Sequence, residues 1–181
     1  MTDDSRQRFV VKPIGFVESN YRNFDDVPHG HNHDKKGWTE ETFRIVLLPE
    51  HAKKLQGLEG FSHIVVVFWI HKSKNWRMPE GHKLPKGVKV FATRMPRRPN
   101  PIGVSVVQVS GFCPRTGTID VMGLDCLDKT PVLDIKPYLA FCDSFPDATV
   151  PDWVGRKRAG LDHHHAGRNH ETERKPAGEK G

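Results

Sequence analysis

The sequence is poor in cysteine and in long apolar runs, and both shortages limit what the protein can be. Its three cysteines, Cys113, Cys126 and Cys142, are odd in number and form no CxxC pair. This pattern favours a reduced, cytoplasmic protein over a disulfide scaffold. The longest apolar run, Ile64 to Ile70, is far too short to span a bilayer. The N-terminal residues MTDDSRQRF contain no apolar signal region, so no membrane partner is expected.

The composition indicates one modest domain with many turns. The chain has 181 residues, of which 36% are hydrophobic, together with 16 glycines and 14 prolines. The formal net charge is +6, which fits an anionic partner such as RNA. No GxGxxG motif follows the first strand-like run, so a Rossmann nucleotide site is not expected.

Six or more strand-like segments joined by short turns predict an all-β fold, a small antiparallel β-barrel with one or two short helices. The near-continuous apolarity of Phe61–His71 predicts a strand buried on both faces. We expect a flexible N-terminus over 1–8, the barrel domain over 9–150, and a polar, His-rich, disordered tail over 151–181. The expected strands are Phe9–Glu18, Glu41–Leu48, Phe61–His71, Gly87–Phe91, Ile102–Gly111 and Thr118–Cys126, and the expected helix is Pro49–Leu55.

The stretch from Phe91 to Ser105, FATRMPRRPNPIGVS, joins two of the expected strands. Its prolines fix φ and push the preceding residues toward extended geometry, so the loop is stiff before any ligand arrives. Its three arginines supply planar, permanently charged groups suited to carboxylates, phosphates or stacked rings. We interpret it as a ligand-binding loop; the alternative is a solvated basic loop.

A second proline-containing stretch, Leu124 to Leu139, is expected to be a rigid loop. It carries Asp134, Lys136 and Tyr138, and carboxylates, an amine and a phenol on a rigid loop suit general acid/base catalysis. The alternative for Asp134 and Lys136 is a plain ion pair.

The segment HGHNHDKKGW places His29, His31 and His33 at alternating positions. In an extended chain these side chains would share a face and could bind zinc, nickel or copper. The alternative is an exposed polar loop, and we assign no metal ligand, because histidine-rich tracts are compositional evidence only.

Three ordered motifs, GLEGFSHIVVVFWIH, GVKVFATRMPRRPNPIGVSVVQV and LDCLDKTPVLDIKPYL, resemble those of the TrmO (YaeB, TsaA-like) family. The resemblance covers about residues 8–150. It implies a small β-barrel that binds S-adenosylmethionine without a Rossmann fold, and a homodimer with the cofactor near the subunit interface. It further implies methylation of the exocyclic amine of threonylcarbamoyladenosine, beside the tRNA anticodon.

The resemblance also implies roles for individual residues. The buried strand should end at the cofactor, the FATR and NPIG segments should form one wall, and the loop from Asp125 to Thr130 should close over it. Asp134 or Tyr138 could accept the proton that the acceptor nitrogen loses, with Lys136 beside them. The expected cofactor-binding residues are His71, Lys72, Phe91, Arg94, Arg98, Asn100, Pro101, Val104, Asp125, Cys126, Leu127, Asp128, Lys129 and Thr130.

Three departures from the family pattern qualify these expectations. VPHGHNHDKKGW replaces an early proline-glycine segment, Lys129 replaces the glycine of LDGTP, and a histidine-rich tail replaces the C-terminal domain of longer members. Two alternatives therefore stay open. One is a methyltransferase acting on a small metabolite or a metal-chelating molecule, and the other is a non-catalytic regulator that binds S-adenosylmethionine or metal.

Overall fold

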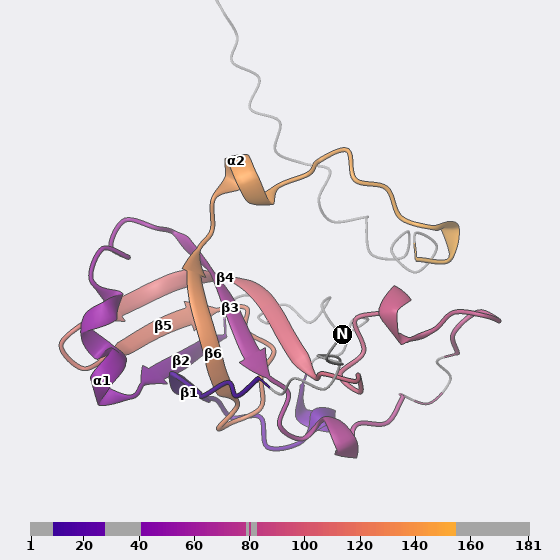
Figure 1. The fold of residues 1–181 in the computed structure, drawn as a ribbon, viewed down its shortest axis with the longest axis horizontal. Coiled ribbons are helices and arrows are strands. Elements are labelled where there is room, and N and C mark those ends of the chain that lie inside the picture. Colours follow the sequence, from indigo (N-terminus) through magenta and orange to yellow (C-terminus); the bar gives the residue numbers. More distant parts are fainter. Residues whose placement is uncertain (1–8, 28–40, 79, 81–82, 155–181) are drawn as a thin grey trace, which may run out of the picture. The chain divides into compact units, whose positions relative to one another are not determined.

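The computed structural model describes residues 9–27, 41–78, 80 and 83–154, and its centre is a closed antiparallel barrel (Figure 1). The chain divides into two compact units, Met1–Pro146 and Asp147–Gly181, and the barrel lies in the first. The order around the barrel is β1-β2-β5-β4-β3-β6, which confirms the predicted fold class. The strands are β1 (Gly15–Glu18), β2 (Thr42–Leu47), β3 (His63–Trp69), β4 (Ile102–Cys113), β5 (Thr118–Met122) and β6 (Pro131–Pro137).

The barrel interior is filled by alternate side chains from all six strands. Strand side chains alternate between two faces, and the buried residues follow this alternation most regularly in β2, β3 and β5. β-branched and aromatic residues dominate these positions, as expected for a pleated and half-buried surface. The inward set, each at most 1% exposed, includes Val17, Phe43, Ile45, Ile64, Val66, Val107, Ile119, Val121 and Val132.

The prediction that β3 is buried on both faces is wrong. Ile64, Val66 and Phe68 point inward, whereas the residues between them are only partly buried and Trp69 is 38% exposed. The outer face of β3 continues onto β4, where Ile102, Val104 and Val106 are 43–50% exposed. We call Trp69, Ile102, Val104 and Val106 the apolar face.

The predicted strand Gly87–Phe91 is also wrong, because a short 3-10 turn, Val90–Ala92, occupies its end. The predicted rigid loop Leu124–Leu139 is wrong in its second half, which forms β6. The prolines that suggested a loop are the first and last residues of that strand, where a missing N–H interrupts little of the ladder. Between Val67 and Phe68 the β3–β6 register shifts, so that Val132 pairs with Phe68 and Asp134 with Val67.

Helical structure is scarce in the described part of the chain. The expected helix forms as α1 (Pro49–Ala52) followed by a 3-10 turn at Lys53–Leu55, with proline in its first turn. The second helix is α2 (Ala140–Asp143). None of the described helices has the length and hydrophobicity to cross a membrane. The candidate metal-binding histidines His29, His31 and His33, and the tail from residue 155, lie outside the described residues.

Candidate functional site

The stiff loop is tied to the end of β3. The backbone N–H of Ile70 donates to the carbonyl of Pro101 at 2.7 Å, and that of Ile102 donates to Asn100 at 2.8 Å. These bonds hold the NPI turn against the residue before His71. The backbone bonds thus join the end of β3 to the proline-rich loop, and the prediction that the two form one cofactor-binding surface stays a prediction.

The arginines of the loop fold back on its own backbone. Nη2 of Arg94 donates to the carbonyl of Val104 at 3.2 Å, and Nη1 of Arg98 donates to the carbonyl of Thr93 at 2.7 Å. Each bond occupies one of five guanidinium donors, so both side chains are positioned while most of their donors stay available. Phe91, in the same loop, is 80% exposed.

The loop between β5 and β6 is fastened to β1 and the residues after it. The N–H groups of Asp128 and Lys129 donate to the carbonyls of Tyr21 and Val17, at 2.7 and 2.8 Å. A turn closed from Thr130 N to Leu127 O places Lys129 at φ 61°. That left-handed conformation favours glycine, so Lys129 stands at a position where glycine would be the unstrained residue.

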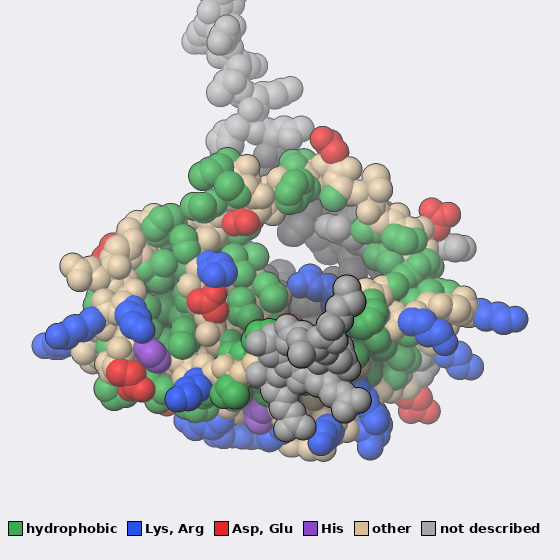
Figure 2. Space-filling model, in the orientation of Figure 1, with side chains coloured by type: hydrophobic (Ala, Val, Ile, Leu, Met, Phe, Trp, Pro, Cys, Tyr) green, Lys and Arg blue, Asp and Glu red, His purple; other side chains and the backbone are tan. Residues whose placement is uncertain are grey.

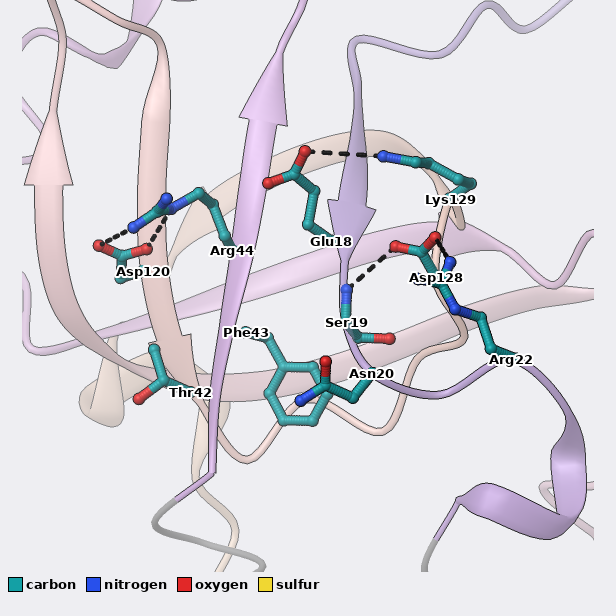
Figure 3. Close-up of a pocket in the computed structure, with 10 residues that line it drawn as sticks. All are labelled: Glu18, Ser19, Asn20, Arg22, Thr42, Phe43, Arg44, Asp120, Asp128 and Lys129. Carbon is teal, nitrogen blue, oxygen red and sulfur yellow. Dashed lines mark hydrogen bonds and ion pairs between the residues drawn. The ribbon is translucent and has the colours of Figure 1, made fainter.

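Side chains reinforce the same attachment. Asp128 is buried, accepts from the N–H of Ser19 at 3.2 Å and forms an ion pair with Arg22 (Figure 3). Ser19 Oγ donates to the carbonyl of Cys126 at 2.9 Å. The segment Ser19–Arg22 was missed at the sequence level, because these contacts join residues more than a hundred positions apart.

His71 connects this loop to β3. Its Nδ1 lies 3.4 Å from Oγ1 of the buried Thr130. Burial, and secondarily the Lys72 cation, lower the pKa of His71, while Asp128 opposes them. The ring is therefore neutral near pH 7 and can act as both hydrogen-bond donor and acceptor. Lys72 Nζ donates to the carbonyl of Arg22 at 2.8 Å. This bond joins the residues that follow β3 to the residues that follow β1.

The loop 125–130 offers its side chains unequally. Cys126 and Leu127 are 2% and 5% exposed and belong to the core, and burial raises the pKa of the Cys126 thiol. They can meet a ligand only through their backbone. Asp125 is exposed and accepts a hydrogen bond from Ser105 Oγ at 3.2 Å. We call His71, Arg94, Val104 and the loop 125–130 the candidate wall.

Of the predicted catalytic residues, Asp134 and Lys136 lie on β6 and Tyr138 follows its last residue, and the structure places none of the three in this wall. Asp134 and Lys136 point outward beside β3 and form an ion pair of 2.6 Å. Asp134 pairs with Val67, which pairs with Val104, so two strand spacings put Asp134 about 10 Å from the wall. Tyr138 donates its N–H to His63 O at the other end of β3, which a strand rise of about 3.3 Å per residue places roughly 25 Å from His71.

A polar hollow of about 470 Å³ adjoins the wall but shares only Asp128 and Lys129 with it (Figure 3). Its charges are paired with one another: Arg44 contacts Asp120 at 2.7 Å and Lys129 lies 3.6 Å from Glu18. Because cation and carboxylate alternate across neighbouring strands, this hollow presents no net charge to a ligand. Among the described residues, no group of three or more His, Cys, Asp or Glu side chains could hold a metal ion.

Comparison with known proteins identifies the family to which this chain is similar. The model of the tRNA-methyltransferase O N-terminal domain matches residues 16–144. The tRNA (adenine(37)-N6)-methyltransferase of Escherichia coli is 36% identical over 149 residues, which cover 78% of this chain and 63% of that protein. An S-adenosyl-L-methionine-binding protein of Archaeoglobus fulgidus is 34% identical over 132 residues, covering 71% of this chain and 88% of that one.

A solved structure agrees with the sequence matches. The crystal structure of TrmO from Pseudomonas aeruginosa superposes with a TM-score of 0.63 at 35% identity, covering 79% of this chain and 61% of that chain. The chain therefore spans about three fifths of the length of its bacterial relatives. The family model matches more than half of the chain and includes both the proline-rich loop and the loop 125–130. The chain belongs to the tRNA-methyltransferase O (TrmO) family.

Proposed function

We propose that this protein is an S-adenosylmethionine-dependent methyltransferase acting on the exocyclic amine of threonylcarbamoyladenosine beside the tRNA anticodon. The observation that carries the proposal is the candidate wall, which assembles the segments that bear the family's motifs. The names of the bacterial and archaeal relatives support the cofactor and the tRNA adenine. Specificity for the threonylcarbamoyl group rests on the resemblance of the motifs.

The chemistry of the candidate wall, together with Phe91 of the proline-rich loop, suits the cofactor. S-adenosylmethionine carries an adenine, a ribose diol and an amino-acid carboxylate, and its sulfonium supplies the methyl group. The exposed ring of Phe91 can stack on a base, Asp125 can accept from hydroxyl groups, and Arg94 has donors left for a carboxylate. Neutral His71 adds a hydrogen-bonding group without repelling a cation.

The chain's part in catalysis is positioning and proton removal. Methyl transfer is an in-line displacement, so holding donor and acceptor in line supplies most of the rate. The amine must then lose a proton, and the geometry favours Asp134 over Tyr138 for this role because Tyr138 lies at the far end of β3. Lys136, at 2.6 Å, would hold the Asp134 carboxylate in place.

We further propose that the protein is a homodimer formed through the apolar face. This face is uncovered on β3 and β4, and its Val104 also belongs to the candidate wall. A second copy seated here would cover exposed apolar side chains and lie beside the cofactor. V106D should shift sedimentation velocity from dimer to monomer, whereas the control V10D, at an 85% exposed valine outside the barrel strands, should not.

Methyl transfer from labelled S-adenosylmethionine tests the function. Total tRNA, tRNA lacking the threonylcarbamoyl group and a small-molecule cell extract would be compared, each with and without chelator. Label in the first sample alone supports the proposal, and label only in the extract would move the acceptor to a small metabolite. R94Q should weaken cofactor binding about 10- to 100-fold, while the control R115Q should bind normally. Undiminished turnover by D134N would remove Asp134 as the base.

A further inference from the structure

The positive charge of the protein is concentrated in one segment. Residues 72–98, between the end of β3 and the NPI turn, contain nine Lys and Arg and a single Glu, which gives a formal charge of +8. The whole chain has +6, so the remaining residues sum to −2. All nine cations are described residues, and we call 72–98 the basic segment.

The basic segment differs from the barrel in how its cations are paired. Within the described ranges, the ion pairs join Arg22, Arg44, Lys129 and Lys136 to carboxylates, and none includes a cation of the basic segment. The polar contacts of Lys72, Arg77, Arg94 and Arg98 are instead made to backbone carbonyls. Such contacts position a cation without neutralising its charge, and Lys72 also interacts electrostatically with the carboxylate of Asp26.

The location of the basic segment relates it to the candidate wall. It begins at Lys72, next to His71, and contains Arg94, so both of its ends meet the wall. Figure 2 shows Lys and Arg side chains projecting on the side of the view where Figure 1 places this segment, and others on the opposite side, beside α1. The segment also carries aromatic side chains, including the exposed Phe91.

We propose that the basic segment binds the phosphate backbone of the RNA substrate and so brings the target base to the candidate wall. The inference rests on the proposed function and names the surface that grips the nucleic acid. Cations held by backbone carbonyls favour a polyanion, and aromatic rings among them favour one with unpaired bases, which is RNA rather than an acidic protein. The barrel outside this segment, with its negative net charge, would contribute little.

Two variants with the same change of net charge test this. K74Q/K83Q/K86Q/K89Q removes four exposed lysines of the basic segment that lie outside the candidate wall. K12Q/K53Q/K54Q/R115Q removes four exposed cations that lie outside the basic segment. Filter binding of the full chain to tRNA would be measured from 50 to 200 mM salt. If all four lysines meet phosphates, wild type should lose about 50-fold more affinity over this range than the first variant, since each contact adds roughly 0.7 to the slope. The second variant should keep the wild-type slope.

The outcomes separate this inference from the proposed function. Equal slopes for the two variants would overturn it, as would binding of the basic segment to anionic vesicles but not to tRNA. Label transferred to tRNA together with equal slopes would leave the function standing and reject the surface. If no label enters tRNA but only the first variant loses salt dependence of tRNA binding, the basic segment is supported as an RNA-binding surface. The proposed methyl acceptor is then rejected. Binding of S-adenosylmethionine should be unchanged in both variants, which confirms that both are folded.

Discussion

Replacing Gly103 with alanine should destabilise the barrel beside the candidate wall. Gly103 pairs with Phe68 across β4 and β3. A Cβ at Gly103 would lie 2.2 and 2.3 Å from Cε2 and Cζ of the Phe68 ring. The ring is 7% exposed and points into the core, so it cannot move aside without disturbing its neighbours. Overpacking of this kind costs about 1–3 kcal/mol of unfolding free energy.

A double-mutant cycle makes the reasoning testable. Phe68→Leu removes the two nearest of the three colliding ring atoms and should by itself cost roughly 1–2 kcal/mol through lost burial. In the double variant the added methyl has more room, so the cost of the double variant should fall short of the sum of the two single costs by about 1 kcal/mol or more. Urea denaturation at constant m-value measures all four proteins.

The control is Gly111→Ala in the same strand. There the nearest atom to an added Cβ is the carboxylate oxygen Oδ2 of Asp120 at 2.8 Å, on a 31% exposed side chain whose movement would disturb only its exposed ion pair with Arg44. Its cost should be below about 1 kcal/mol. Costs of Gly103→Ala and Phe68→Leu that add within about 0.5 kcal/mol would refute the collision.

Three more predictions concern the loop 125–130 and its neighbours. Lys129→Gly should change the free energy of unfolding by less than about 1 kcal/mol in urea, because relief of the left-handed backbone offsets the entropy of glycine; a larger loss would show that the lysine side chain holds the turn. Asp128→Ala should cost about 1–3 kcal/mol by leaving the N–H of Ser19 without its acceptor, whereas Glu18→Gln, in an exposed pair with Lys129, should cost under about 1 kcal/mol. Lys72→Gln should raise the pKa of His71 in an NMR titration, since it removes a cation that lowers it. Because that pKa is lowered on folding, the stability it contributes is present above the unfolded value of about 6.5 and is lost as pH falls through the folded pKa; an unchanged pKa in the variant would contradict this.

The strands were predictable where the alternation of side chains was clear, and the errors have physical causes. β6 was missed because Pro131 and Pro137 looked like breakers, although they stand at the ends of the strand, where the ladder tolerates them. The two-sided apolarity of β3 was taken for burial on both faces. In the structure it marks an inner core row and an outer apolar face.

The sequence predicted which segments contribute to the candidate site, but not the hydrogen bonds and ion pairs that hold them together. The proline-rich loop and the loop 125–130 carried recognisable motifs, whereas the bonds of Ser19 and Arg22 to Asp128 depend on how the barrel closes. The concentration of charge in residues 72–98 could have been counted from the sequence alone. The sequence could not show which cations form ion pairs. In the structure, carboxylates pair with cations of the barrel such as Arg44 and Lys129.

The closure of the barrel has a consequence for ligand binding. β1 and β6 share only two register pairs, Gly15 with Val132 and Phe16 with Pro131. The same short seam is extended by bonds from Ile14 and Val17 to Val132 and Thr130. A ligand that binds the loop 125–130 should therefore also stabilise the β1–β6 pairing, which is the shortest in the barrel. Ligand binding should then slow amide hydrogen exchange along β1. In this protein the segment that closes the barrel, between β1 and β6, is continuous with the loop 125–130 of the candidate site.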